Sequence, residues 1–137
     1  MSRTIYITET DYERLTDLLQ SGTAGSQRDN SNHHKLESEL ERAMIVDAKE
    51  IPRDVITMNS KAVLMDMDSK KEITHTLVFP SQADSAKNKI SILAPIGMAM
   101  LGYRTGDIFE WKVPAGTRRM KIIKILYQPE AAGDYHL

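Results

Sequence analysis

The chain has 137 residues, of which 41% are hydrophobic and 27% charged, and its formal net charge at pH 7 is −1. This length is typical of one domain with at most a small helical appendage. The near-zero charge argues against nonspecific binding to nucleic acid or anionic membranes, because both require a surplus of basic residues. The chain contains no cysteine, which excludes disulfides, thiolate catalysis and sulfur ligands for a metal.

The first residues lack the basic stretch and apolar run of a secretory signal. No apolar run in the chain reaches the roughly 18–20 residues that are needed to cross a bilayer. The absence of cysteine agrees with a reducing compartment. We therefore expect a cytoplasmic protein that makes no membrane contact.

The N-terminal part of the chain has a helical hydrophobic pattern. Apolar residues recur at helical spacing in two stripes, which comprise Tyr12, Leu15, Leu18 and Leu19 in the first and Leu36, Leu40, Ala43 and Met44 in the second. The first helix is expected to begin at Thr8, followed by Asp11, or at Thr10, followed by Glu13. At such a start a side chain accepts hydrogen bonds from free backbone N–H groups. The sequence thus predicts two short helices.

A run of small and polar residues separates the two stripes, from Ser21 to Asn32, and such a composition predicts a loop. Two short helices joined in this way form an antiparallel hairpin. Pro52 disfavours a helical conformation at the residue before it and should end the second helix. We therefore expect a helical hairpin in residues 1–51 and a second unit in residues 52–137.

After Pro52 the hydrophobic period changes to two, which indicates strands. The expected strands cover residues 55–58, 62–67, 73–79, 90–93, 108–113 and 119–127. One short helix interrupts them, because Ile96, Met100 and Leu101 fall at helical spacing before Gly102. These elements predict an α+β fold, in which one short helix crosses a strongly bent antiparallel sheet.

The histidines offer little support for a metal or catalytic site. His33 and His34 are adjacent on the second helix, where neighbouring side chains point about 100° apart and cannot easily share one ion. No further ligand at a suitable spacing completes a metal set around them. His75 alternates in phase with apolar neighbours of its strand, so we expect a half-buried, hydrogen-bonded ring without a catalytic role.

Charged residues near two predicted turns are expected to face solvent. Asp66 and Asp68 share one strand face, but paired carboxylates need an enclosed site to separate their pKa values, and these flank a charged turn. A basic cluster on the last hairpin has no alternating aromatic residues to stack with bases; it comprises Arg118, Arg119, Lys121 and Lys124. Such a cluster is typical of a solvated strand face, and the alternative is contact with an acidic partner surface.

Four short motifs in residues 94–116 resemble the C-terminal domain of the Gre transcript-cleavage factors. That family carries S-P-(I/M), A-L-(L/I)-G, V-G-D and T-P-x-G in this order, and this chain has A-P-I, A-M-L-G, T-G-D and V-P-A-G at the same spacing. The opening MSRTIYIT and the ending YQPEAAGDYHL are similar to a narrower branch of the family, the regulators of nucleoside diphosphate kinase. The resemblance covers essentially the whole chain.

The resemblance implies a fold and a partner. It implies that the C-terminal unit is FKBP-like and that the chain binds RNA polymerase, on the coiled coil at the rim of the secondary channel. The residues that correspond to the docking step of the family are Leu93, Ala94, Pro95, Ile96 and Met98. Leu93 stands at a position where those factors often carry an acidic residue.

The predicted hairpin departs from the family in its length and at its tip. Gre factors thread a long coiled coil down the channel and hold a catalytic magnesium ion with acidic residues at its tip. Here each helix of about 12–16 residues is roughly 18–24 Å long, and the tip carries one acid, Asp29, beside Arg28. Because magnesium recruitment favours converging carboxylates, we expect no bound metal, no cofactor and no cleavage activity.

The sequence therefore predicts a non-enzymatic regulator that docks on RNA polymerase and competes there with Gre factors, with neither a small-molecule substrate nor a sequence-specific contact to nucleic acid. Three alternatives stay open. The first is an active transcript-cleavage factor, whose tip would need paired acids. The second is a peptidyl-prolyl isomerase, which would need an aromatic-lined pocket from two Phe, one Trp and five Tyr. The third is a protein-binding module that acts directly on nucleoside diphosphate kinase.

Overall fold

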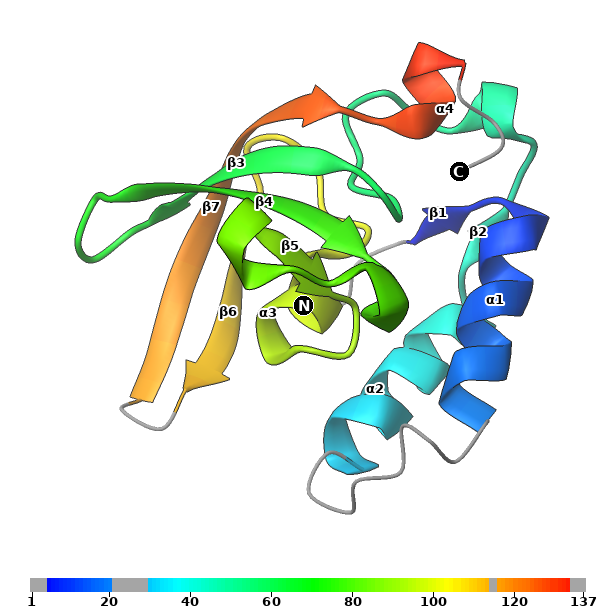
Figure 1. Ribbon diagram of the computed structural model, residues 1–137, viewed down its shortest axis with the longest axis horizontal. Coiled ribbons are helices and arrows are strands. Elements are labelled where there is room, and N and C mark those ends of the chain that lie inside the picture. The colour runs from blue at the N-terminus through cyan, green and yellow to red at the C-terminus, as the bar shows by residue number, and fades with distance from the viewer. Residues whose placement is uncertain (1–4, 21–29, 114–115, 134–137) are drawn as a thin grey trace.

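The computed structural model describes residues 5–20, 30–113 and 116–133. Two helices lie beside a curved sheet whose strands are mostly antiparallel, and a third, short helix lies against that sheet (Figure 1). This arrangement confirms the predicted α+β class. Within the described part of the chain, no helix is long and apolar enough to cross a membrane.

The two N-terminal helices run antiparallel and pack side by side (Figure 1). Helix α1 covers Glu9–Gln20 and helix α2 covers Asn30–Glu41. The start of α1 is fixed by Thr8, whose Oγ1 accepts a hydrogen bond of 3.2 Å from the backbone N–H of Asp11. Leu15 of α1 and Leu36 and Leu40 of α2 are buried in the core, as their helical spacing predicts.

The second helix ends earlier than the sequence pattern predicts, and the prediction for its C-terminal end was wrong. Strand β2, Met44–Ile45, pairs in parallel with strand β1, Tyr6–Ile7. The backbone N–H of Met44 donates to Ile5 O at 2.8 Å. Met44 continues the helical spacing only by coincidence, because its backbone pairs with a segment almost forty residues away. The 3₁₀ helix η2, Ala48–Glu50, then precedes Pro52, which therefore does not end α2.

The main sheet has five strands in the order β5-β4-β3-β7-β6. They cover Lys89–Ser91 (β5), Glu72–Val78 (β4), Lys61–Asp66 (β3), Gly116–Tyr127 (β7) and Ile108–Val113 (β6). All neighbouring strands are antiparallel except β4 and β5, which pair in parallel. The sheet is therefore mostly antiparallel, and the predicted antiparallel pairing does not extend to β5. Parallel pairing requires a connection that carries the chain back along β4 before β5 begins. This connection contains the 3₁₀ helices η3, Pro80–Gln82, and η4, Ser85–Lys87.

The predicted strand at residues 55–58 is not a strand. Val55 forms one isolated bridge with Arg104, and Ile56 exchanges backbone hydrogen bonds of 2.9 Å with the loop after the short helix, through Gly102 and Tyr103. The segment is nevertheless fully buried. Its apolar residues therefore reflect burial under a loop rather than position in a ladder, and a short apolar run does not distinguish the two.

Both parts of the chain contribute to one hydrophobic core. Ile5, Leu15 and Leu36 from the N-terminal part belong to the same buried cluster as Leu64 and Ile122 from the sheet. Helix α3, Pro95–Met100, covers part of the inner face of the sheet and also contacts α2. A last short helix, α4, Pro129–Ala132, was not predicted and lies near the start of α1 (Figure 1).

Candidate partner-binding site

The predicted docking step lies where β5 turns into α3. Ala94 has an extended backbone conformation as the N-cap, and Pro95 occupies the first helical turn, where its missing N–H and fixed φ are tolerated. Two hydrogen bonds of 3.0 Å tighten the turn, from the N–H of Leu93 to Ser91 Oγ and from the N–H of Ala94 to Ser91 O. These hydrogen bonds stabilise the backbone of the step.

Burial divides the five predicted docking residues. Ile96 and Met98 are each 6% exposed and belong to the core, whereas Leu93 and Ala94 are half-buried. The side chain of Pro95 lies outside the described part of the structure. Ile96 and Met98 can therefore shape this surface from beneath, while Leu93 and Ala94 provide side chains that a partner could contact directly. We call residues 93–98 the α3 surface.

A groove with a volume of about 590 Å³ opens beside the α3 surface, and we call it the inner-face groove. Its apolar side is formed by Ile73, Ile96 and Met120. At one edge Arg118 Nη1 donates to Asp66 Oδ2. The backbone N–H groups of Asp68 and Ser69, together with Arg118, hold the pKa of the Asp66 carboxyl below its usual range.

His75 lines the same groove and is half-buried, in agreement with the sequence-based expectation. Burial lowers the pKa of His75, although a hydrogen bond between the ring and the backbone of Asn88 acts in the opposite direction. The ring is therefore neutral near pH 7. Its Nδ1 atom is buried and has no hydrogen-bond partner among the described residues.

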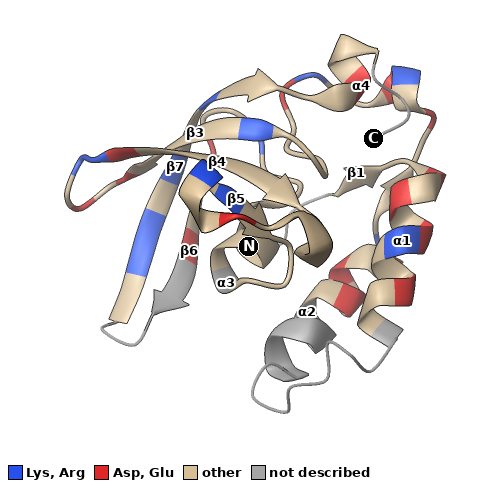
Figure 2. Ribbon diagram, in the orientation of Figure 1, with Lys and Arg blue, Asp and Glu red and all other residues tan. Residues whose placement is uncertain are grey.

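The basic cluster predicted on the last hairpin is divided by the sheet. Figure 2 shows lysine and arginine along β7, but alternate residues of a strand point to opposite faces. Arg118 lies with Met120 at the inner-face groove and pairs with Asp66. Arg119 and Lys121 occupy the alternate positions, opposite Glu110 and Ile108 of β6. Arg119 and Asp68 are 3.9 Å apart and both well exposed, which agrees with a solvated edge.

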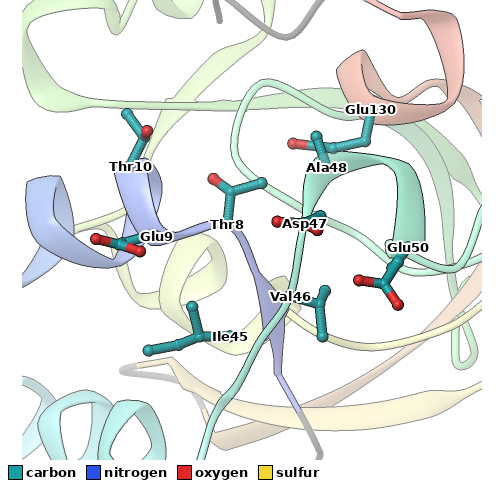
Figure 3. A pocket seen from close by; sticks show the side chains of 9 residues that line it. All are labelled: Thr8, Glu9, Thr10, Ile45, Val46, Asp47, Ala48, Glu50 and Glu130. Atoms are coloured by element: carbon teal, nitrogen blue, oxygen red, sulfur yellow. The ribbon is translucent and has the colours of Figure 1, made fainter.

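An acidic pocket of about 510 Å³ lies between the start of α1, β2, η2 and α4 (Figure 3). Four carboxylates line it, from Glu9, Asp47, Glu50 and Glu130. Glu130 is only 7% exposed. Its Oε1 accepts a hydrogen bond of 2.7 Å from the hydroxyl of Thr57. Within the described residues, no group of three or more metal-ligating side chains is placed to hold an ion.

Glu130 also belongs to a group of buried polar side chains that joins α1, the loop before β3 and α4, and we call this group the polar junction; it comprises Asp11, Thr57, Gln128 and Glu130. Asp11 is 1% exposed. Burial raises the pKa of Asp11 to about 6, Arg14 opposes the rise, and Glu130 adds to it. Arg14 Nη2 lies 3.1 Å from Asp11 Oδ1, but the geometry is that of an ion pair and not of a hydrogen bond.

Gln128 completes the polar junction. Its Nε2 donates to the carbonyl oxygens of Pro52, at 2.8 Å, and of Val55, at 2.7 Å. These bonds satisfy two backbone acceptors, one at Pro52 and one at Val55, the first residue of the segment that the sequence suggested as a strand. Sequence reasoning missed this junction, because its members are up to 119 positions apart and each is unremarkable locally. The only available signal was Pro129, which is suited to a helix start directly after Gln128.

Two further sets of predicted residues cannot be placed. Arg28 and Asp29, at the predicted hairpin tip, lie outside the described residues. His33 and His34 lie on the backbone of α2, but their side chains lie outside the described part of the structure. Helices α1 and α2 have 12 residues each, so each helix is roughly 18 Å long.

Comparison with known proteins gives matches over nearly the whole chain. Residues 51–127 match the family described as transcription elongation factor GreA/GreB, C-terminal, and residues 3–46 match the family described as Rnk N-terminus. The chain is 39% identical over 140 aligned residues to the regulator of nucleoside diphosphate kinase of Escherichia coli K12, with 100% of each chain covered. It is 36% identical over 91 residues to the transcription elongation factor GreA of Clostridium botulinum, and this match covers 66% of this chain and 57% of that protein.

A solved structure extends this similarity to three dimensions. The transcription elongation factor GreA/GreB from Nitrosomonas europaea superimposes with a TM-score of 0.77 and is 42% identical, and the match covers 90% of this chain and 100% of that one. The alignment therefore includes both the helical pair and the sheet, and the similarity is not limited to the motifs around α3.

Proposed function

The chain belongs to the GreA/GreB family of transcription elongation factors, and on that premise we propose that it binds RNA polymerase and regulates transcription without cleaving the transcript. The observation that carries the proposal is the family match over residues 51–127, which includes the α3 surface and all four motifs around it. We propose that the α3 surface docks at the rim of the polymerase secondary channel, where it competes with Gre factors. A cytoplasmic location follows from this role.

The hydrogen-bonded backbone and mixed burial of the α3 surface support docking there. Leu93 and Ala94 present apolar groups that are partly covered, and hydrogen bonds to Ser91 hold their backbone in place. Preorganisation of this kind lowers the entropy that a partner must remove on binding. Buried Ile96 and Met98 then support the surface from the core.

Competition binding tests the proposal. Purified polymerase core enzyme should bind the labelled chain, and saturating Gre factor should displace it. Pro95→Asp and Ala94→Asp should each weaken binding at least tenfold, because a carboxylate in an apolar contact must lose its hydration, at a cost above about 1.4 kcal/mol. Ala86→Asp, at an exposed position of η4, is the matched control. Undiminished occupancy at saturating Gre factor would show that the two proteins use different sites.

The length of the helical pair supports a role without transcript cleavage. At roughly 18 Å for 12 residues, helices of this length are too short to reach a deeply buried active centre. The tip also has a single acid, Asp29, next to Arg28, and this is a weak ligand set for magnesium. Backtracked elongation complexes should therefore release no additional 3′ fragments when the chain is added. Factor-dependent fragments that disappear with Asp29→Ala would contradict this reading.

A second candidate function is direct binding to nucleoside diphosphate kinase. It is favoured by one observation, the 39% identity over the full chain to a protein named regulator of nucleoside diphosphate kinase. We regard an indirect effect on the kinase, through regulation of transcription, as the better explanation of that relative's name. Parallel pull-downs with polymerase and with the kinase separate the two: retention of the kinase alone would support the second candidate and contradict the first.

A further inference from the structure

Strand β2 is the outer strand of a two-stranded sheet, because within the described part of the chain it pairs with β1 alone. The N–H group of Met44 donates to Ile5 O at 2.8 Å. That of Val46 donates to Ile7 O at 3.0 Å. Since successive residues of a strand direct their backbone groups to opposite edges, those of Ile45 face away from β1. The free edge of β2 is therefore open to pairing with one more strand.

Both side chains of β2 are apolar and exposed. Met44 is 51% exposed and Ile45 is 49% exposed, whereas Ile7, opposite Ile45 on β1, is 2% exposed. Adjacent side chains of a strand point to opposite faces, so each face of β2 offers apolar surface beside the free edge. A strand that paired there would cover part of this surface, and removal of apolar surface from water favours association.

The acidic pocket adjoins this edge, because Ile45 and Val46 line it (Figure 3). Four carboxylates line it as well, whereas no lysine or arginine does. Figure 3 shows the carboxylates of Glu9 and Glu50 on opposite sides of the pocket. The ion pairs among the described residues involve other acids. The pocket therefore holds a local surplus of negative charge in a chain whose net charge is only −1.

This charge selects the kind of strand that the edge accepts. Charged side chains near an exposed edge discourage pairing with other chains, but here the charges of the pocket have one sign, so they repel an acidic segment and attract a basic one. Glu130 strengthens the selection, because it is only 7% exposed and solvent screens a buried charge less. A hydrogen bond of 2.7 Å from the hydroxyl of Thr57 fixes its carboxylate in position.

We propose that β2 and the acidic pocket form a docking surface for an extended basic segment of a partner protein. The backbone of the segment pairs with the free edge at Ile45, as in other cases of strand addition. A lysine or arginine of the segment enters the pocket between Glu9 and Glu50, where Ile45 and Val46 contact its aliphatic stem. This surface shares no residue with the α3 surface, and the proposal does not depend on polymerase binding.

Labelled peptides test the charge selection on the full chain. A peptide of alternating lysine and valine should bind, as measured by fluorescence anisotropy, and added salt should weaken its binding. A peptide of alternating glutamate and valine should bind about tenfold more weakly or less. Glu9→Gln combined with Glu50→Gln should weaken binding of the lysine peptide about tenfold. Glu72→Gln combined with Glu110→Gln removes two exposed carboxylates from the main sheet and is the matched control.

Two isoleucines with the same exposure test the position of the edge. Ile45 on β2 and Ile108 on the edge strand β6 are each 49% exposed. Ile45→Thr should weaken binding of the lysine peptide about threefold, and Ile108→Thr should leave it unchanged. Saturating peptide should also slow hydrogen exchange of the Ile45 amide about fivefold or more, as followed by NMR, without slowing that of Ile108. Thermal unfolding verifies that each variant is folded.

Each outcome decides for or against the docking surface. Selective binding of the lysine peptide, together with loss of binding in the Glu9 and Glu50 double variant and protection of the Ile45 amide, supports it. Equal binding of the two peptides, or no binding of either, overturns the charge selection. Protection at Ile108 instead of Ile45 moves the contact to β6 and overturns the proposal. Self-association in analytical ultracentrifugation that Ile45→Thr abolishes assigns the edge to a second copy of this chain, which also overturns it.

Discussion

Replacing Asp11 with asparagine should change how the stability of this protein depends on pH. Asp11 is 1% exposed in the polar junction, and burial raises its pKa from 3.8 to about 6. Arg14 stabilises the charged form only partly, because it is itself 40% exposed and forms no hydrogen bond with Asp11 Oδ1. Glu130, 7% exposed, adds a second acidic group to the same buried region.

The direction of the effect follows from proton binding. Between about pH 4 and pH 6 the folded chain retains a proton on Asp11 that the unfolded chain has released, so stability falls as the pH rises through this range. Above about pH 6 Asp11 is ionised in both states and its contribution no longer changes. The difference between 3.8 and about 6 corresponds to about 3 kcal/mol at about 1.4 kcal/mol per pH unit.

Urea denaturation between pH 4.5 and pH 7.5 measures this contribution. Asp11→Asn should have nearly the stability of the natural chain at pH 4.5 and should be more stable at pH 7.5, because the amide resembles the protonated acid. Asp17→Asn, at an exposed position of the same helix, is the matched control for the loss of one carboxylate. An unchanged slope in Asp11→Asn, or a carboxyl titration near pH 4 in NMR spectra of the folded chain, would refute the reasoning.

Two further substitutions test packing and polar contacts. Gly97→Ala should destabilise the fold by about 3 kcal/mol or more, because a Cβ at this position would lie 2.1 Å from the backbone oxygen of Ser91. A melting temperature within one or two degrees of that of the natural chain would contradict the close approach of α3 to β5. Gln128→Met should lower the free energy of unfolding, measured by urea denaturation, by about 2–4 kcal/mol, because it leaves the carbonyl groups of Pro52 and Val55 without their donor. An unchanged free energy of unfolding would show that water replaces the amide.

Local sequence rules identified the elements whose stabilising contacts are close in the chain. Thr8 and Asp11 form the N-cap that their spacing offers, and the hairpin of β6 and β7 lies where alternation predicts it. The strand-to-helix turn at Pro95 was also predicted correctly, because proline in the first turn is a local signal. Each of these features depends on backbone geometry within a few residues.

The sequence alone therefore determined the α+β class, the two N-terminal helices, the short helix at Pro95 and the family. The tertiary structure decided the parallel pairing of β1 with β2, the exposure of Ile73, the burial of His75 Nδ1 and the burial of Asp11 within the electrostatic influence of Glu130. Propensity and periodicity report on neighbours along the chain, whereas burial, hydrogen-bond satisfaction and pKa depend on which distant segments meet.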